Sequence, residues 1–80
     1  MGAKELLIYI VRELVDDPDS IDVREIESED GNELTLELRV AKEDMGKVIG
    51  RQGRIARELR TIMRSAAGIA DKRVSVEICD

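Results

Sequence analysis

The chain is 80 residues long, 42% hydrophobic and 39% charged, with a net charge of −5 at neutral pH. Its length predicts a single domain with a modest core. Because Tyr9 is the one aromatic residue, that core has to be aliphatic. Stacking of bases on aromatic side chains is likewise excluded as the main source of affinity for a nucleic acid. The absence of histidine and the single cysteine, Cys79, exclude a disulfide within the chain and any zinc-ligand spacing, so we expect no metal and no cofactor.

The first predicted element is a helix over residues 3–15. Its apolar residues recur at the spacing of one buried stripe: Leu6, Leu7, Ile10, Val11 and Leu14. Ile8, Tyr9 and Val15 widen the apolar surface beyond that stripe, and either the sheet of the same domain or a partner protein would cover them. The helix is expected to end before Pro18, because proline disfavours helical geometry in the preceding residue and the neighbouring aspartates favour turns.

Two strands follow, joined by a hairpin. Residues 21–28 form the first strand, although alternation fails between Val23 and Ile26, which leaves open a bulge or an early end of the strand. Residues 29–32 have the chemistry of a hairpin turn. Beyond the turn the alternation is regular, with one face made of Leu34, Leu36, Leu38 and Val40 and the other of Thr35, Glu37 and Arg39.

The most informative stretch is Gly46–Arg64, in which Gly50 and Gly53 stand three residues apart with Arg51 and Gln52 between them. Glycines let the backbone turn sharply and approach a ligand closely, because they have no Cβ. We therefore predict two short helices with a glycine turn between them.

The second of these helices is predicted to be amphipathic. At about 100° per residue, one side carries Ile55, Leu59, Ile62, Met63 and Ala66, and the other carries Arg54, Arg57, Arg60 and Arg64. Residues 42–64 include seven basic and three acidic side chains, whereas the rest of the chain has six basic and fifteen acidic ones. The glycine turn thus lies in a cationic segment of an acidic protein, which suits a nucleic-acid partner but also a solvated charged helix face.

The helix is predicted to stop at residues 66–69, where Gly68 would take the left-handed conformation that ends many helices. In the last strand Val74, Val76 and Ile78 alternate with Ser75, Glu77 and Cys79. Two strands joined by a helical crossover lie parallel, the crossover being right-handed in nearly all proteins. The fold class is therefore α+β: a three-stranded mixed sheet with three helices on one face, in the order α-β-β-α-α-β.

This order of elements, with VIGRQGR at the turn, resembles the type II K-homology (KH) RNA-binding domain, and most closely the small bacterial single-KH-domain proteins of the KhpA-like family. The resemblance implies one KH domain over residues 1–80 whose GxxG loop clamps the backbone of about four nucleotides of single-stranded RNA. It also implies pairing, as a homodimer or as a heterodimer with a larger KH-containing protein. The implied role is that of an RNA chaperone or post-transcriptional regulator in bacterial growth and division.

The candidate RNA contacts are the residues that match the binding loop and its flanks: Lys47, Val48, Ile49, Gly50, Arg51, Gln52, Gly53, Arg54, Ile55 and Arg57. Helix N-termini offer unpaired N–H groups to phosphate oxygens, and Arg51, together with Lys47 and Arg54, would add charge-assisted contacts. What the resemblance implies for the bases is a narrow aliphatic groove beside the loop, made by Val48, Ile49, Ile55 and the second strand near Leu38 and Val40. Each of these apolar residues also fits a place in the core.

Other charged residues are expected to have lesser roles. Arg57, Arg60 and Arg64 lie progressively farther from the loop and should mainly set the long-range field. Glu58 follows Arg54 by one turn, the less favourable order for an ion pair, and should be solvated. The acidic turn at residues 29–31 would weaken binding if it lay near the RNA path. A single domain of this kind should bind weakly and with little sequence preference.

Two other functions were weighed against RNA binding. Catalysis is disfavoured, because no carboxylate pair has a recognisable supporting shell and GKVIGRQG is not a phosphate-binding GxxxxGK[ST] loop; we expect no enzyme and no small-molecule substrate. A KH fold that has lost RNA binding and serves only as a protein-interaction module stays open, its glycines then merely forming a sharp corner. The N-terminus lacks a signal-peptide core and no apolar run approaches the ~20 residues of a membrane span, so we expect a cytoplasmic protein without a membrane partner.

Overall fold

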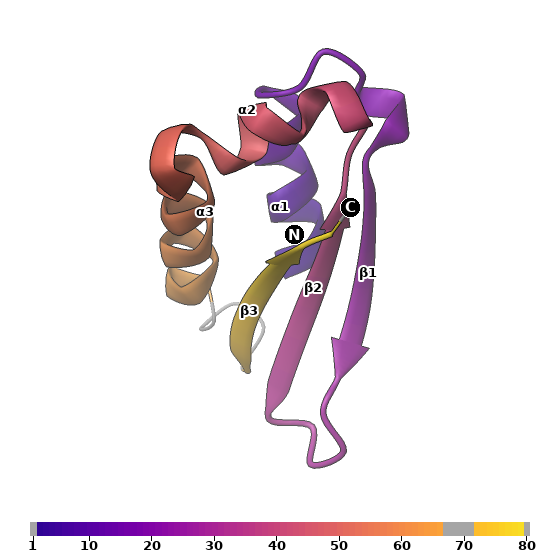
Figure 1. The fold of residues 1–80 in the computed structure, drawn as a ribbon. Helices are drawn as coiled ribbons and strands as arrows, with labels where there is room; N and C mark the ends of the chain where they lie inside the picture. Colours follow the sequence, from indigo (N-terminus) through magenta and orange to yellow (C-terminus); the bar gives the residue numbers. More distant parts are fainter. Residues whose placement is uncertain (1, 67–71, 80) are drawn as a thin grey trace.

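The computed structural model describes residues 2–66 and 72–79, and its elements follow the predicted order. The helices are α1 (Ala3–Arg12), α2 (Met45–Ile49) and α3 (Arg54–Ser65), and the strands are β1 (Asp22–Glu27), β2 (Glu33–Arg39) and β3 (Arg73–Ile78). Short 3-10 turns at Pro18–Ser20, Lys42–Asp44 and Arg51–Gly53 complete the described chain (Figure 1). The predicted α+β fold is confirmed.

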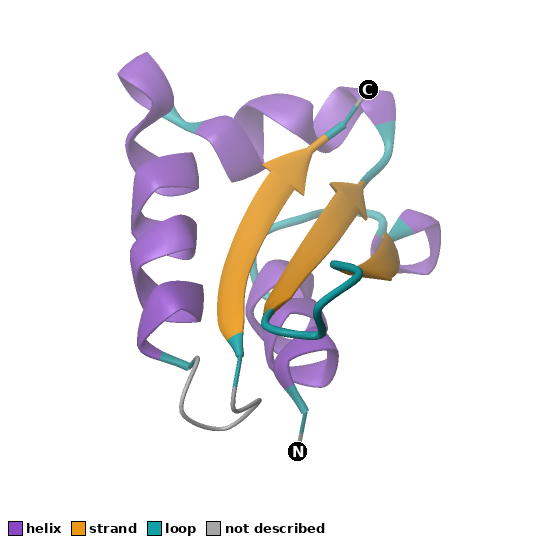
Figure 2. Cartoon of the chain, turned by 90° about the horizontal axis from the view of Figure 1, so that it is seen from below, coloured by secondary structure: helices purple, strands orange, loops and turns teal. Residues whose placement is uncertain are grey.

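The sheet has the order β1-β2-β3, with β2 in the centre. β1 pairs with β2 antiparallel, and β3 pairs with β2 parallel, because α2 and α3 carry the chain back across the sheet between them. This is the predicted topology. β3 consequently forms one edge of the sheet, and Figure 2 shows α3 running alongside that edge.

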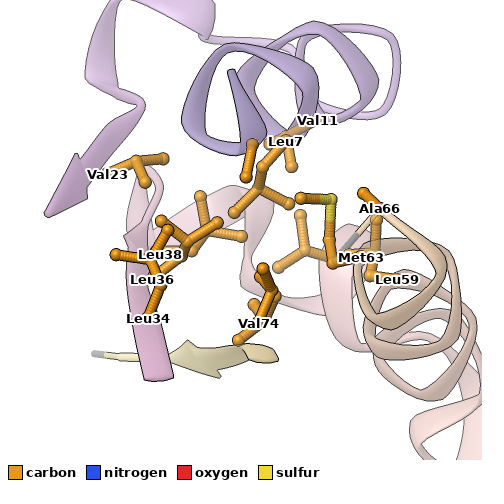
Figure 3. Packing of buried hydrophobic residues seen from close by; sticks show 13 residues of the cluster. Leu7, Val11, Val23, Leu34, Leu36, Leu38, Leu59, Met63, Ala66 and Val74 are labelled. Atoms are coloured by element: carbon orange, nitrogen blue, oxygen red, sulfur yellow. The ribbon is translucent and has the colours of Figure 1, made fainter. Parts of the chain in front are cut away.

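The core is aliphatic, as predicted, and lies between the sheet and the helices. Every second residue of β2 is buried, namely Leu34, Leu36 and Leu38, as the period of two in a strand requires. These leucines meet the buried stripes of α1 and α3, which contribute Leu7, Val11, Leu59 and Met63 (Figure 3). On the other face of β2, Thr35, Glu37 and Arg39 have no helix over them.

The first strand contains no bulge. Its register with β2 runs without interruption from Asp22 opposite Arg39 to Glu27 opposite Leu34. Alternation therefore places Val23 in the core and Ile26 on the open face of the sheet, where its side chain is 40% exposed. The broken sequence pattern reflects an exposed isoleucine on a regular strand.

The first helix ends at Arg12, three residues earlier than predicted. The backbone N–H groups of Asp16 and Asp17 donate to the side chain of Asp44 rather than to helical carbonyls, so the chain has already left the helix there. Within α1 the buried residues are Ala3, Leu7 and Val11, while Leu6 and Ile10, together with Leu14 just beyond the helix, pack against the core at its margin.

The buried face of α3 is rotated relative to the prediction. Ala56, Leu59, Met63 and Ala66 are buried, whereas Ile62 is 44% exposed. At about 100° per residue, the buried direction marked by Ala56 and Met63 leaves Ile62 on a flank of the helix. The predicted left-handed stop at Gly68 lies outside the described residues.

Candidate nucleic-acid interface

A sharp corner joins α2 to α3, as predicted from the two glycines. Gly50 ends α2 with φ 76° and ψ 175°, Gln52 has φ 56° and ψ 26°, and Gly53 has φ 76° and ψ 16°. The N–H of Gly50 donates to the carbonyl of Gly46 over 2.9 Å, and the N–H of Gly53 donates to the carbonyl of Gly50 over 3.2 Å. Three of four successive residues thus have positive φ, which glycine adopts without strain.

The two glycines differ in what surrounds them. A Cβ on Gly50 would lie 2.4 Å from Cγ1 and 2.9 Å from the backbone N of Ile55, whereas a Cβ on Gly53 would meet no atom within 4 Å. Ile55 packs under the corner and against the core, which explains its half-buried side chain. The geometry of the corner accounts for both glycines by itself, so the case for a ligand has to come from the charges around it.

The tip of the corner is cationic and open. Arg51 and Gln52 are exposed, and Arg51 makes no ion pair or side-chain hydrogen bond with any residue in the described ranges. In the same part of the chain, no side chain caps the N-terminus of α3. The N–H of Arg54 donates to the carbonyl of Arg51, so only the N–H groups that follow it in the first turn of α3 could bind an anion.

Two further candidate cations are already engaged. The guanidinium of Arg54 lies 3.4 Å from the carboxylate of Glu58, and both side chains are exposed. This ion pair was not predicted, because an arginine that precedes a glutamate by one helical turn is the less favourable order. Lys47 donates to the carboxylates of both Asp16 and Asp44. These hydrogen bonds, that with Asp16 foremost, raise the pKa of Lys47 above its ordinary value.

The role of Asp44 in this region was not predicted from the sequence. Only 2% of its side chain is exposed, and its two oxygens accept the N–H groups of Asp16 and Asp17 over 3.2 and 3.0 Å. Burial by itself would raise the pKa of Asp44, but the two amides and Lys47 outweigh it and hold the pKa below its ordinary value. Stabilisation from this contact is therefore present at neutral pH and is lost as the pH falls through the lowered pKa. From the sequence alone, an acid at the start of α2 suits the positive end of the helix dipole, and no further role can be inferred.

A groove of about 620 Å³ runs between α3 and β3. Its lining consists of Arg60, Arg64, Arg73, Val74, Ser75, Val76 and Glu77. Arg60 and Arg64 were expected mainly to set the long-range field, but both lie in the wall of this groove. The Nε of Arg60 donates to the carbonyl of Val76 over 3.3 Å.

The strand side of the groove offers backbone rather than side chains. The N–H groups of Arg73 and Cys79 donate toward β2, to the carbonyls of Asn32 and Leu38. Because successive residues of a parallel strand point their backbone groups to opposite sides, those of Val74 and Val76 face away from β2 and into the groove. The side chains of both valines are buried in the core.

The aliphatic groove predicted beside the second strand stays a prediction, and two of the residues assigned to it are buried in the free protein. Leu38 and Val48 are fully buried, since β2 is the central strand and α2 packs onto it, so neither faces a ligand. Val40 lies at the margin of the core, and Ile49 is the one predicted aliphatic contact that is exposed. The groove of the free protein borders β3.

The acidic hairpin turn lies away from the glycine corner. It precedes β2, whereas α2 follows the other end of that strand (Figure 1). Its neighbour is Arg73, whose N–H donates to Asn32 and whose guanidinium lies 3.7 Å from Glu33. Any effect of its charge would therefore fall on the far end of the groove.

The order α-β-β-α-α-β with a glycine corner between the last two helices defines a KH domain. The chain belongs to the KhpA/KhpB KH domain family, whose model matches residues 4–78, and the predicted family resemblance is confirmed. Both that description and the names of the relatives are those of binding proteins, which confirms the prediction that the chain is not an enzyme.

Several curated relatives are similar over nearly their whole length. The chain is 53% identical over 75 residues to the "RNA-binding protein KhpA" of Clostridium acetobutylicum, which covers 94% of this chain and 97% of that protein. The protein of the same name from Caldanaerobacter subterraneus is 51% identical over 74 residues, covering 92% and 96%. That from Treponema pallidum is 49% identical over 77 residues, covering 96% and 94%.

One solved structure has a similar fold. A crystal structure of Era from Aquifex aeolicus matches with a TM-score of 0.62 and 23% identity, over 95% of this chain and 29% of that one. At this identity the likeness concerns the fold alone. Within the described ranges, no helix has the length and apolarity to cross a membrane, and no group of three or more side chains could hold a metal ion.

Proposed function

We propose that this protein binds single-stranded RNA, with phosphates at the glycine corner and bases in the groove between α3 and β3. The observation that carries the proposal is the arrangement of cations along α3: Arg51, which has no ion-pair partner among the described residues, lies at the corner before its N-terminus, and Arg60 and Arg64 wall the groove farther along the same helix. The rest of the chain is strongly acidic, so this is where phosphate would be attracted. The names of the KhpA relatives support the same function.

The groove suits bases despite the lack of aromatic rings. Arginine guanidinium planes can stack on unpaired bases, and Arg60 and Arg64 are placed to do so. The outward backbone groups of Val74 and Val76 can hydrogen-bond to base edges. We expect about two to four phosphates to be neutralised, each contributing about −0.7 to the slope of the logarithm of the binding constant against the logarithm of the salt concentration. Binding should therefore be weak and only modestly salt-dependent. Such binding fits an RNA chaperone or post-transcriptional regulator in the cytoplasm.

The path of the RNA can be tested with two arginines of α3. Arg64 lines the groove, whereas Arg57 does not, although both are exposed and belong to the same helix. Arg64→Ala should weaken binding of a short labelled RNA by about tenfold, the value of one charge-assisted contact, and Arg57→Ala by much less. Fluorescence anisotropy at low salt measures both. Because the two arginines are seven residues apart and so lie on the same face of α3, a larger loss with Arg57→Ala would place the RNA nearer the glycine corner than the groove. No binding by the unchanged protein at high micromolar concentration would favour an interaction module.

We further propose that the protein pairs with a second copy through the flank of α3 that carries Ile62. Ile62 and Arg60 are two residues apart and so project about 200° from each other around the helix. Pairing at Ile62 would therefore leave both grooves open. Two linked sites raise avidity by about 10² or more where the geometry permits, which compensates for a weak single site.

Pairing through Ile62 can be tested by measuring the mass of the protein in solution. Ile62→Glu should convert a dimer to a monomer in sedimentation equilibrium at micromolar concentration, because it places a charge in the middle of an apolar contact. Ile26→Glu is the matched control, since Ile26 is 40% exposed on the open face of the sheet. An unchanged protein that is already monomeric would instead point to a heterodimer with a larger KH-containing protein.

A further inference from the structure

The ammonium of Lys47 lies between two unequal carboxylates. Asp44 belongs to the core, with 2% of its side chain exposed, whereas 83% of the side chain of Asp16 is exposed. The side chain of Lys47 itself is 42% exposed. Lys47 belongs to α2 three residues before Gly50, and its ammonium lies beside Asp44, three residues earlier in the chain.

The two contacts of Lys47 differ in how easily they are lost. The carboxylate of Asp44 is fixed by the N–H groups of Asp16 and Asp17, and Lys47 lies 3.2 Å from its Oδ1. The carboxylate of Asp16 has Lys47 as its only side-chain partner among the described residues, and it is open to water. Exposed ion pairs contribute little free energy and exchange readily with other ions. A phosphate oxygen reaching the corner would therefore displace Asp16 and leave Asp44 in place.

We propose that Asp16 is an internal competitor of RNA phosphate for Lys47, and that Asp44 is the positioning residue that fixes the ammonium on α2, next to the corner in the chain. The proposal rests on the proposed RNA-binding function. In the free protein Asp16 neutralises Lys47, so part of the attraction of the corner is withheld until the contact breaks. Asp16 thereby lowers the affinity of the site without touching the nucleic acid.

Removing the competing charge provides the test. Asp16→Asn keeps the backbone N–H that Asp44 accepts, and it should raise the affinity for a short labelled RNA about fivefold, the ratio that corresponds to one exposed ion pair. Asp19→Asn is the matched control, because Asp19 lies in the same loop, is exposed and forms no ion pair within the described part of the chain. It removes the same charge and should raise affinity by less than twofold.

A second pair of variants shows whether the effect acts through Lys47. In a Lys47→Gln background, Asp16→Asn should have no more effect than Asp19→Asn, since the contested ammonium is gone. Circular dichroism at 20 °C or a urea titration verifies that each variant is folded. RNA binding with equal effects of Asp16→Asn and Asp19→Asn would overturn the competition while leaving the proposed function intact. Failure of every variant to bind RNA would overturn both.

Discussion

Gly50→Ala is expected to destabilise the protein by about 3 kcal/mol. Gly50 combines φ 76° with ψ 175°, a region that residues with a Cβ essentially do not adopt. The new methyl group would also lie 2.9 Å from the backbone N of Ile55, which cannot move without displacing the start of α3. A chain of this size has a total stability of about 4–12 kcal/mol, so a large part of it would be lost.

Gly53→Ala is the control for a positive φ in the ordinary left-handed region and without crowding. Gly53 has φ 76° and ψ 16°, the ordinary left-handed region, and open space where the Cβ would be. Its substitution should cost about 1 kcal/mol. Urea unfolding followed by circular dichroism measures both variants. Equal losses would mean that Ile55 gives way and that the packing under Gly50 contributes nothing.

The fold was predictable because its local patterns and its topology agree. Leu34, Leu36 and Leu38 alternate with polar residues without interruption, so the two-residue period of a strand predicted both the central strand and its buried face. The glycine corner followed from the spacing of Gly50 and Gly53, and the parallel pairing of β3 from the helical crossover. Each of these inferences uses only neighbours in sequence or a general rule of chain connection.

The groove and the buried carboxylate were not predictable in the same way. The groove beside β3 was not foreseen because strand order determines which strand faces α3, and β2 lies in the centre. The carboxylate of Asp44 accepts hydrogen bonds from backbone N–H groups 27 and 28 residues away along the chain, and no residue next to Asp44 in the sequence indicates those partners. Arg60 was assigned to the outer side because Ile62 was counted as buried, although Ala56 sets the direction of the helix.

The corner therefore has two separable properties. Its glycines are required by backbone geometry, and its charges are not required by the fold, since Arg51 and Gln52 are exposed and Arg51 has no ion pair within residues 2–66 and 72–79. A variant that changes only the charges should leave stability intact while altering any interaction with phosphate. Loss of binding with retained stability would then be evidence for a site rather than for a fold.

Replacing Arg51 and Gln52 together by aspartate is expected to reduce RNA affinity about 100-fold or more. The change removes a charge-assisted contact, worth about 1.5–3 kcal/mol, and places two negative charges where phosphate would lie. The fold should tolerate it, because exposed substitutions usually alter stability by less than about 0.5 kcal/mol. Gln52 has φ 56° and ψ 26°, and aspartate accepts the left-handed region more readily than most residues.

The control for this variant changes the charge equally at a different place. Arg24→Asp with Asn32→Asp makes the same change of net charge on exposed residues of β1 and the hairpin turn, away from the corner. If attraction by the corner governs binding, this control should lower the affinity for a short labelled RNA only a few-fold at low salt, and less at higher salt, because screening removes distant charges first. Equal losses in the two variants would mean that net charge alone controls binding. Unchanged binding by the aspartate corner would show that RNA contacts the domain elsewhere.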